Sequence, residues 1–149
     1  MIRFVTGDLF ASGAQTLTNT VNCVGVMGKG VALEFRRHFP PMYEDYCRRA
    51  RAGLVLPGQP YLYTESNPWV LNFPTKRHWR DKARLTDIED GLRFLREHYR
   101  EWGIESLALP PLGCGLGGLY WSQVKPLIQQ HLGDLEIQVT VFEPVESGT

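Results

Sequence analysis

Short apolar runs alternate along the chain with longer segments in which apolar residues recur at helical spacing. The short runs are rich in β-branched and aromatic residues, which favour strands. Six such runs are present, at residues 2–5, 17–21, 61–63, 69–73, 106–109 and 137–142. Because strands that alternate with helices form layered folds, the pattern predicts an α/β protein with a largely parallel or mixed sheet.

Helical patterns lie between these strands. After the second strand, an apolar stripe leads into a helix predicted over 41–52; the stripe consists of Val31, Ala32 and Phe35. Thr86 or Asp87 is predicted to cap a long helix that ends at Gly103. One face of this helix carries Ile88, Leu92, Leu95 and Tyr99. The last predicted helix covers 121–131 and ends at Gly133.

Two glycine-rich loops each follow a predicted strand and open a helix. The first contains Gly28-Lys29-Gly30-Val31, and the second is Gly113-Cys114-Gly115-Leu116-Gly117-Gly118-Leu119. Glycine lets backbone N–H groups approach an anion closely, and a helix N-terminus adds a favourable dipole. Ligands of such sheets bind beyond the carboxyl ends of the strands, where both loops fall. The loops therefore predict a clamp around two linked phosphates; the alternative is that the glycines only make tight turns.

Neither loop fits a common nucleotide-binding motif in its context. The second loop matches GxGxxG, with Glu136 near the distance expected for a ribose ligand. A single predicted strand follows it, however, and a Rossmann domain needs a full βαβαβ unit. The first loop resembles the end of a P-loop, but Val31 stands where a Mg²⁺-binding Ser or Thr is required. These contexts argue against an NAD-dependent dehydrogenase and an NTPase.

Composition favours one soluble globular domain over residues 1–149. The chain has 16 Lys and Arg against 16 Asp and Glu, so it has no global charge that attracts nucleic acid. A local basic segment is nevertheless present, with Lys76, Arg77, Arg80, Lys82 and Arg84. The polar tail 146–149 is predicted to be frayed or to mark a cut inside a longer protein, so that the domain would be its N-terminal part.

Cysteine and histidine spacing predicts no metal site and no cofactor. Three cysteines without a CxxC spacing fit a reducing cytoplasm; they are Cys23, Cys47 and Cys114. Cys114 lies at a predicted helix N-terminus, which would lower the pKa of its thiol. The helical histidines lack metal-ligand spacing; they are His38, His98 and His131. No transmembrane or signal-peptide pattern is present, so a cytoplasmic location and no membrane partner are expected.

At this point the sequence resembles the macrodomain family, whose fold binds ADP-ribose, over nearly its whole length. The matching segments are Thr6-Gly7-Asp8-Leu9-Phe10, residues 19–25, residues 28–32 and residues 106–116. The resemblance implies a mixed central sheet flanked by helices, an α/β/α sandwich. Gly113-Cys114-Gly115-Leu116 and Thr75-Lys76-Arg77 are similar to the branch that contains terminal ADP-ribose glycohydrolases. Residues 72–79 resemble most the antitoxin macrodomains that remove ADP-ribose from thymidine bases of DNA.

The resemblance also implies a role for individual residues. Asp8 would accept a hydrogen bond from the adenine amino group, with Leu9 beside it. Asn22 would hold and orient the distal ribose, and residues 28–31 would face that ribose and the phosphates. Residues 113–119 would close over the diphosphate. The implied partners are ADP-ribose, ADP-ribosylated single-stranded DNA and a DNA ADP-ribosyltransferase toxin.

Lys76 is the catalytic residue that the resemblance implies, acting with Asn22. A lysine can be a nucleophile when its amine is partly neutral, and burial and the nearby Arg77 and Arg80 favour the neutral form. In the related terminal glycohydrolase an aspartate follows the GCGL turn and acts with the lysine, whereas this chain has Gly117. Either Lys76 acts without that carboxylate or another group substitutes. Without the resemblance, Lys76 would read as a solvated surface lysine.

The basic segment with interleaved aromatic residues predicts a DNA contact; its candidates are Arg77, His78, Trp79 and Arg80. The alternative is a solubilising loop. Three alternative functions are considered for the whole chain. The first is a glycohydrolase that acts on ADP-ribosylated DNA, and the second is a reader module that binds ADP-ribose without cleaving it. The third is a glycohydrolase that acts on ADP-ribosylated protein carboxylates.

Overall fold

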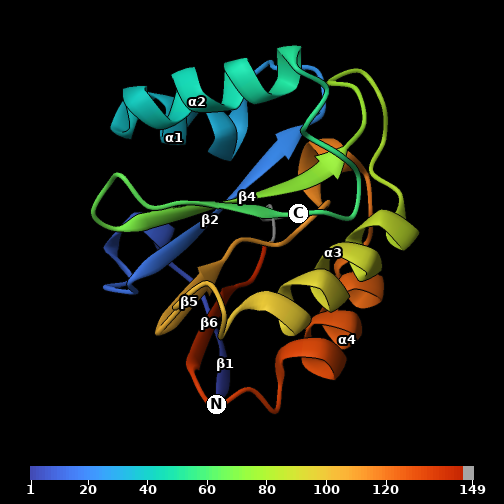
Figure 1. Ribbon diagram of the computed structural model, residues 1–149. Helices are drawn as coiled ribbons and strands as arrows, with labels where there is room; N and C mark the ends of the chain where they lie inside the picture. The colour runs from blue at the N-terminus through green and yellow to red at the C-terminus, as the bar shows by residue number, and fades with distance from the viewer. Residues whose placement is uncertain (146–149) are drawn as a thin grey trace.

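The computed structural model describes residues 1–145, so the predicted tail 146–149 lies outside the described residues. Six strands form one sheet in the order β1-β6-β5-β2-β4-β3 (Figure 1). Their bounds are β1 Ile2–Val5, β2 Thr16–Asn22, β3 Tyr61–Tyr63, β4 Trp69–Lys76, β5 Ser106–Leu109 and β6 Gln138–Phe142. Only β3 pairs in the antiparallel direction, with β4. The predicted mixed sheet is therefore confirmed.

Helices cover both faces of this sheet. Helices α1 (Gly30–His38) and α2 (Pro40–Arg51) lie on one face, and α3 (Leu85–His98) and α4 (Trp121–Leu132) on the other. Two short 3₁₀ helices, Leu9–Ala11 and Gly115–Gly117, lie in the loops that follow β1 and β5. The α/β/α sandwich implied by the resemblance is thus the observed fold.

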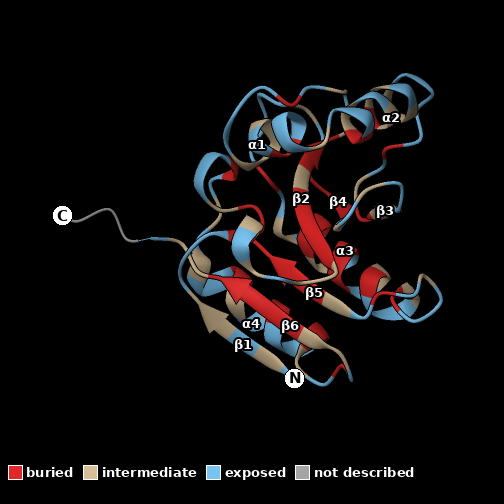
Figure 2. Cartoon of the chain, turned by 90° about the vertical axis from the view of Figure 1, so that its left-hand side faces the viewer, coloured by how far each residue is buried: buried red, intermediate tan, exposed pale blue. Residues whose placement is uncertain are grey.

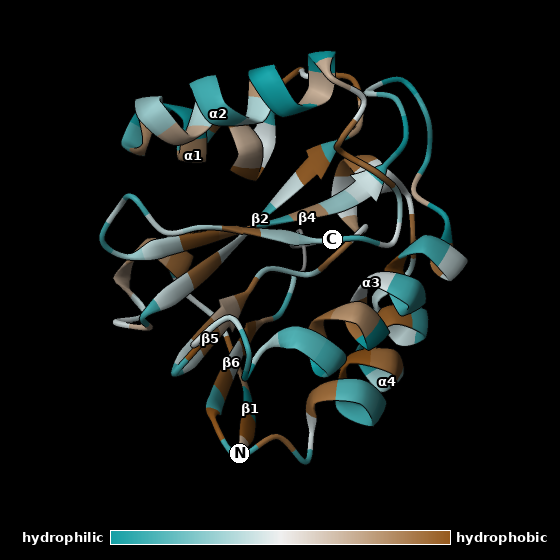
Figure 3. Ribbon diagram, viewed as in Figure 1, coloured by the Kyte–Doolittle hydropathy of each residue, from teal (hydrophilic) through white to brown (hydrophobic). Residues whose placement is uncertain are grey.

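Each sheet face has its own apolar core, which follows from the alternation of side chains along the strands. On β4, Val70 packs with the α1 and α2 core, whereas Leu71 and Phe73 pack with the α3 and α4 core. The central strands are accordingly buried on both faces (Figure 2). Hydrophobic residues, drawn brown in Figure 3, concentrate in the strands and in the inner turns of the helices. Much of α2 is hydrophilic and is drawn teal. Burial on both faces places the sheet at the centre of the molecule.

A glycine within α3 brings that helix close to the sheet. A Cβ atom at Gly91 would overlap the ring of Phe73 on β4. Glycine costs about 1 kcal/mol in a helix interior relative to alanine. The glycine at residue 91 lets α3 pack closely against β4. This close packing positions the first turn of α3 relative to the end of β4.

Three predicted boundaries are wrong, for identifiable reasons. Helix α3 begins at Leu85 after the N-cap Arg84, not after Thr86 or Asp87, and ends at His98 rather than at Gly103. The carboxylate of Asp87 is bonded to a side chain from outside the helix and does not cap it. Strand β4 continues beyond residue 73, although Pro74 lacks an N–H group. It can do so because β3 pairs only with residues 70–72, which leaves that edge of β4 open at Pro74.

Candidate functional site

The predicted site residues gather at one edge of the sheet, because parallel strands end on the same side. Asp8 follows β1, the second glycine loop follows β5, Asn22 ends β2 and Lys76 ends β4. These strands stand in the order β1, β6, β5, β2 and β4. The site is therefore a row, with Asp8 toward one end, the two glycine loops in the middle and Lys76 toward the other end.

Asn22 and Lys76 are register partners at the ends of adjacent strands. A register shift between Val21 and Asn22 precedes this pairing, which reaches into the loops where Cys23 N donates to Arg77 O at 3.3 Å. Deeper in the sheet, the side chain of Asn19 donates to Asn72 Oδ1 at 3.0 Å between the same strands. This buried polar contact holds β2 against β4 below the register shift, and the shift then brings Asn22 opposite Lys76.

The side chain of Asn22 is largely taken up by its own loop. Its Oδ1 accepts from the backbone N–H groups of Val24 (3.1 Å) and Val26 (3.3 Å), and its Nδ2 donates to Val26 O at 2.7 Å. These bonds orient the amide, since the oxygen must face the two N–H donors. The other N–H of Nδ2 makes no hydrogen bond within residues 1–145, and this hydrogen is what Asn22 can offer to a ligand.

Tyr46 on α2 completes the same network, and sequence reasoning missed it. Its hydroxyl lies 2.7 Å from Asn22 O and 2.9 Å from Asn22 Oδ1, and it accepts from Gly25 N at 3.2 Å. The ring is fully buried, and burial raises the pKa of this hydroxyl well above its ordinary value. Tyr46 therefore stays protonated and holds the loop. In the sequence it is indistinguishable from an ordinary apolar-face aromatic.

Lys76 is half-buried, and its Nζ donates to Trp79 O at 3.0 Å. This bond curls residues 76–79 into a compact turn at the end of β4. Within the turn, the rings of His78 and Trp79 stack at 5.4 Å, and the guanidinium of Arg80 lies 4.5 Å from the centre of the Trp79 ring. Trp79 is 43% exposed. The turn therefore combines an exposed aromatic ring with cationic groups.

Arg77 points from this turn to α3. Its Nε and Nη2 each lie 3.1 Å from the carboxylate of Asp87, which is 6% exposed. The hydrogen bond to this carboxylate raises the pKa of Arg77. The structure thus places Arg77 in an anchoring contact, while the predicted DNA contact of its remaining donors stays a prediction.

The second glycine loop closes on itself and on the segment that precedes α3. Leu119 N donates to Gly113 O at 3.0 Å, and Ala83 N donates to Gly117 O at 2.9 Å. Its tip approaches the first glycine loop: a Cβ at Gly30 would lie 3.8 Å from Leu116 Cδ1. Leu116 is 65% exposed. The two loops thus come together above the edge of the sheet, as a clamp requires.

The position of the expected aspartate has little room. Gly117 is buried, and a Cβ there would lie 3.1 Å from Ala83 Cβ. This separation is tighter than ordinary van der Waals contact, so a larger side chain would displace Ala83. The packing of Ala83 therefore accounts for the glycine at this position.

At the other end of the row, Asp8 is exposed and caps a 3₁₀ helix, accepting from Phe10 N at 3.0 Å through Oδ1. Its Oδ2 accepts no hydrogen bond from the described part of the chain, so it can accept one from a ligand. Leu9 beside it is buried in the α1 and α2 core. Glycine loops, Asp8, Asn22 and Lys76 thus share one edge.

The pKa of the Cys114 thiol is raised, whereas its place in the sequence predicted that it would be lowered. Burial raises it, and the adjoining 3₁₀ helix is too short to supply a strong dipole. Burial also raises the pKa of Cys23, with a further contribution from Asp87. Residues 1–145 contain no cluster of three metal-binding side chains, and none of their helices has the length and apolarity needed to cross a membrane.

Comparison with known proteins gives a consistent result. The Macro domain family model matches residues 18–128. The chain is 47% identical over 152 residues to the DNA ADP-ribosyl glycohydrolase of Thermus aquaticus, covering 99% of this chain and 42% of that relative. It spans less than half the length of the curated relatives that it matches first.

Solved structures agree with this result. The macrodomain of Thermus aquaticus DarG superposes with a TM-score of 0.91 at 46% identity, covering 97% of this chain and 99% of that one. The Thermosipho africanus DarTG structure in complex with ADP-ribose gives a TM-score of 0.94 at 44% identity, covering 99% of this chain and 43% of that one.

Proposed function

This chain belongs to the macrodomain family, and we propose that it is a glycohydrolase that removes ADP-ribose from thymidine bases of single-stranded DNA. In this proposal it is the macrodomain of an antitoxin that reverses the reaction of a DNA ADP-ribosyltransferase toxin. The observation that carries the proposal is the pairing of Asn22 with Lys76 beside two facing glycine loops. A relative at 47% identity is named a DNA ADP-ribosyl glycohydrolase, and another at 42% is a fusion with a DNA ADP-ribosyl transferase.

The order of the strands gives the proposed orientation of ADP-ribose. The adenine lies near Asp8 and Leu9 after β1. The diphosphate lies between residues 28–31 and residues 113–119, where it meets the backbone N–H groups that are not bonded within the loops. The distal ribose then reaches Asn22 and Lys76 at the ends of β2 and β4. This order follows the covalent order of ADP-ribose, so no sharp bend of the ligand is required.

The proposed reaction breaks the bond between C1″ of the distal ribose and the thymine nitrogen. The free N–H of Asn22 orients the ribose, and the amine nitrogen of Lys76 uses its lone pair to form a bond to C1″. The thymine ring leaves with the bonding electron pair as a stabilised anion, which takes a proton from water. Water then hydrolyses the ribosyl–lysine bond, which releases ADP-ribose and regenerates the amine. In the resting structure Lys76 is bonded to Trp79 O, and it must exchange this bond for the substrate.

We also propose that Trp79, His78 and Arg80 contact the DNA near the modified base. An exposed indole ring and a nearby guanidinium provide a surface on which an unpaired base stacks and a phosphate is neutralised. Arg77 contributes to this surface through the donors that Asp87 leaves free. The stacking is independent of base identity, which suits an enzyme that selects the ADP-ribose group itself.

The test is the Lys76→Ala variant, assayed separately on ADP-ribosylated single-stranded DNA and on ADP-ribosylated protein. We expect the wild-type chain to release ADP-ribose from DNA, and the variant to lose at least about 100-fold in rate. Calorimetric affinity for free ADP-ribose should change little. Lys125→Ala, which removes a lysine of α4, is the matched control. Undiminished turnover by the Lys76 variant contradicts its role. Binding of ADP-ribose without release from either substrate indicates a reader module, and release only from protein indicates a protein-directed hydrolase.

A further inference from the structure

We propose that the outer surface of α2 binds the phosphate backbone of the DNA strand that carries the ADP-ribose. This α2 basic surface consists of Arg48 and Arg51 together with Val24 of the adjoining loop. The inference rests on the proposed glycohydrolase function and adds a strand contact separate from Trp79 and Arg80. It therefore concerns how the enzyme holds the polymer and not how it holds ADP-ribose.

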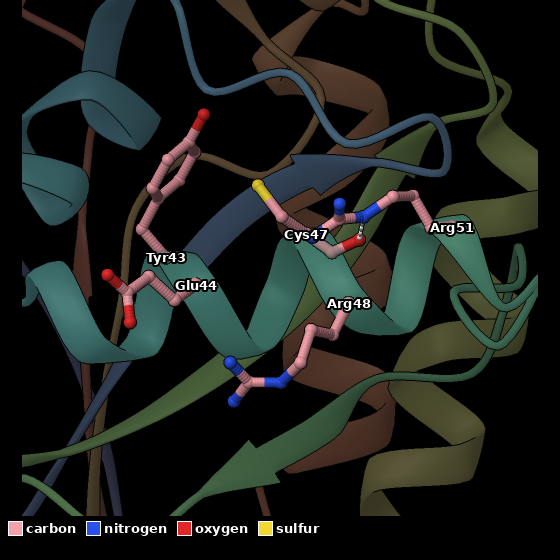
Figure 4. Close-up of a pocket in the computed structure, with 5 residues that line it drawn as sticks. All are labelled: Tyr43, Glu44, Cys47, Arg48 and Arg51. Carbon is pink, nitrogen blue, oxygen red and sulfur yellow. Dashed lines mark hydrogen bonds between the residues drawn. The ribbon is translucent and has the colours of Figure 1, made fainter.

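Two adjoining hollows define the surface. One, of about 400 Å³, lies along α2 and is lined by Tyr43, Glu44, Cys47, Arg48 and Arg51 (Figure 4). The other, of about 340 Å³, is lined by Val24, Gly25, Cys47, Ala50 and Arg51. Because they share Cys47 and Arg51, the depression is continuous from the outside of α2 to the loop that Asn22 organises.

The last turn of α2 concentrates positive charge on this depression. It contains three arginines, of which Arg49 is committed to Asp45 at 2.9 Å and to the ring of Tyr61. Arg48 lies 3.9 Å from the same carboxylate, and its side chain is 65% exposed. Arg51 makes no ion pair within residues 1–145, and its Nε donates to Cys47 O at 3.4 Å. Two guanidinium groups are thus largely available, opposed in the lining by Glu44 alone.

Exposed apolar side chains stand beside these arginines. Val24 is 47% exposed, and Leu54, which follows α2, is 61% exposed. Isolated exposed apolar residues are common, but here Val24 lines the basic depression itself, and Leu54 follows the last turn of α2 by three residues. Unpaired bases have apolar faces that need cover when a strand lies on a protein, whereas the phosphates need cations. The combination therefore fits a single strand of nucleic acid.

The place of the surface also agrees with a strand that leaves the site. In the proposed reaction the modified base is attached to the distal ribose, at the ends of β2 and β4. The C-terminal turn of α2 lies at the same edge as the ends of these strands (Figure 1). A Cβ at Gly25, in the loop after β2, would lie 3.3 Å from Ala50 Cβ on α2. A strand leaving the reacting ribose therefore meets this turn next.

The test compares wild type with the Arg48→Ala/Arg51→Ala double variant at several salt concentrations. The substrates are an ADP-ribosylated thymidine nucleotide and an ADP-ribosylated single strand of about 20 nucleotides. We expect KM for the long strand to rise while kcat and the short substrate are unaffected. The log–log salt slope for binding the long strand should become shallower by about 1.4. A fourfold rise in salt would then cost the variant about sevenfold less affinity than it costs wild type. The Arg93→Ala/Arg100→Ala variant, which removes two charges from the α3 side, should keep the wild-type slope.

The outcomes separate this proposal from the function on which it rests. If wild type releases no ADP-ribose from either DNA substrate, the proposed function fails. If wild type is active and the double variant keeps the wild-type slope and KM, only the α2 basic surface is overturned. A parallel loss of affinity for free ADP-ribose also overturns it, because the arginines would then act through the Asn22 loop. Calorimetry on free ADP-ribose measures this directly.

Discussion

The guanidinium of Arg77 donates two hydrogen bonds, each of 3.1 Å, to the carboxylate of Asp87. These bonds join the end of β4 to the first turn of α3. The carboxylate is buried, while the guanidinium is partly open to water. Since Arg77 follows Lys76 directly, the contact fixes the backbone from which Lys76 extends. Arg77–Asp87 is therefore a positioning contact for the candidate catalytic lysine.

Replacing Asp87 with Asn should lower kcat by about 10-fold to 100-fold, because a displaced catalytic group loses rate steeply. The KM for the ADP-ribosylated nucleotide should change little, since within residues 1–145 the carboxylate of Asp87 is hydrogen-bonded to Arg77 and not to either glycine loop. Asp90→Asn, an exposed acid of the same helix, serves as the control. An equal loss in both variants, or a change confined to KM, would show that Asp87 does not position Lys76. Steady-state kinetics on both variants measures the effect.

Tyr46→Phe should weaken the Asn22 loop. The change removes the hydroxyl that joins Asn22 to Gly25, and it leaves the half-buried N–H group of Gly25 without this partner. Such a loss destabilises a protein by about 1–3 kcal/mol. Urea unfolding should show it, and kcat should fall because the Asn22 amide is less firmly oriented. Tyr43→Phe, one turn earlier, should leave kcat unchanged, since the Tyr43 ring instead faces Arg36. Equal kcat values in the two variants would contradict the role of Tyr46.

Gly117→Ala should destabilise the chain, by about 1–3 kcal/mol for an overpacked site. The added methyl group would press on Ala83 Cβ. Gly28→Ala is the matched control, because its Cβ would meet only Val26 at an ordinary 3.7 Å. Adding Ala83→Gly to the Gly117 variant should recover part of the loss. Denaturant midpoints of the four proteins test the packing, and equal midpoints for both single glycine variants would refute it.

The ionisation of Asp134 should make the free energy of unfolding depend on pH between about pH 4 and pH 2. The hydrogen bond from Arg96 lowers the pKa of Asp134 from 3.8 to about 2. Because the pKa is lower in the folded state, the ionised carboxylate of Asp134 stabilises the folded state fully above about pH 4. This stabilisation is lost as the pH falls through 2. The stability difference between wild type and Asp134→Asn should therefore be constant at neutral pH and shrink between pH 4 and pH 2. A difference that is flat across this window would contradict the shift.

Features that arise from a local sequence pattern could be predicted from the sequence. Features that depend on contacts between residues distant in the sequence could not. Apolar periodicity predicted the six strands and the helices, and glycine spacing predicted loops that the structure brings together at Gly30 and Leu116. The functions of Tyr46 and Asp87 had no local signal. Each depends on a partner at least ten residues away in the sequence, so that Tyr46 looks like an ordinary apolar-face residue and Asp87 like a helix cap. The glycine at 117 needed Ala83 for its explanation.

Leu116 of the second glycine loop reaches to Gly30 of the first, so the two loops meet over the middle of the candidate site. A nucleotide bound beneath this contact would exchange by sliding lengthwise or when the two loops part. In the proposed reaction, the substrate is tethered to a polymer at its ribose end and has the adenine as its free end, whereas the released product has two free ends. Product release is thus less constrained than substrate entry, and the contact between the loops affects the rates of these two steps unequally while the equilibrium stays that of the chemistry.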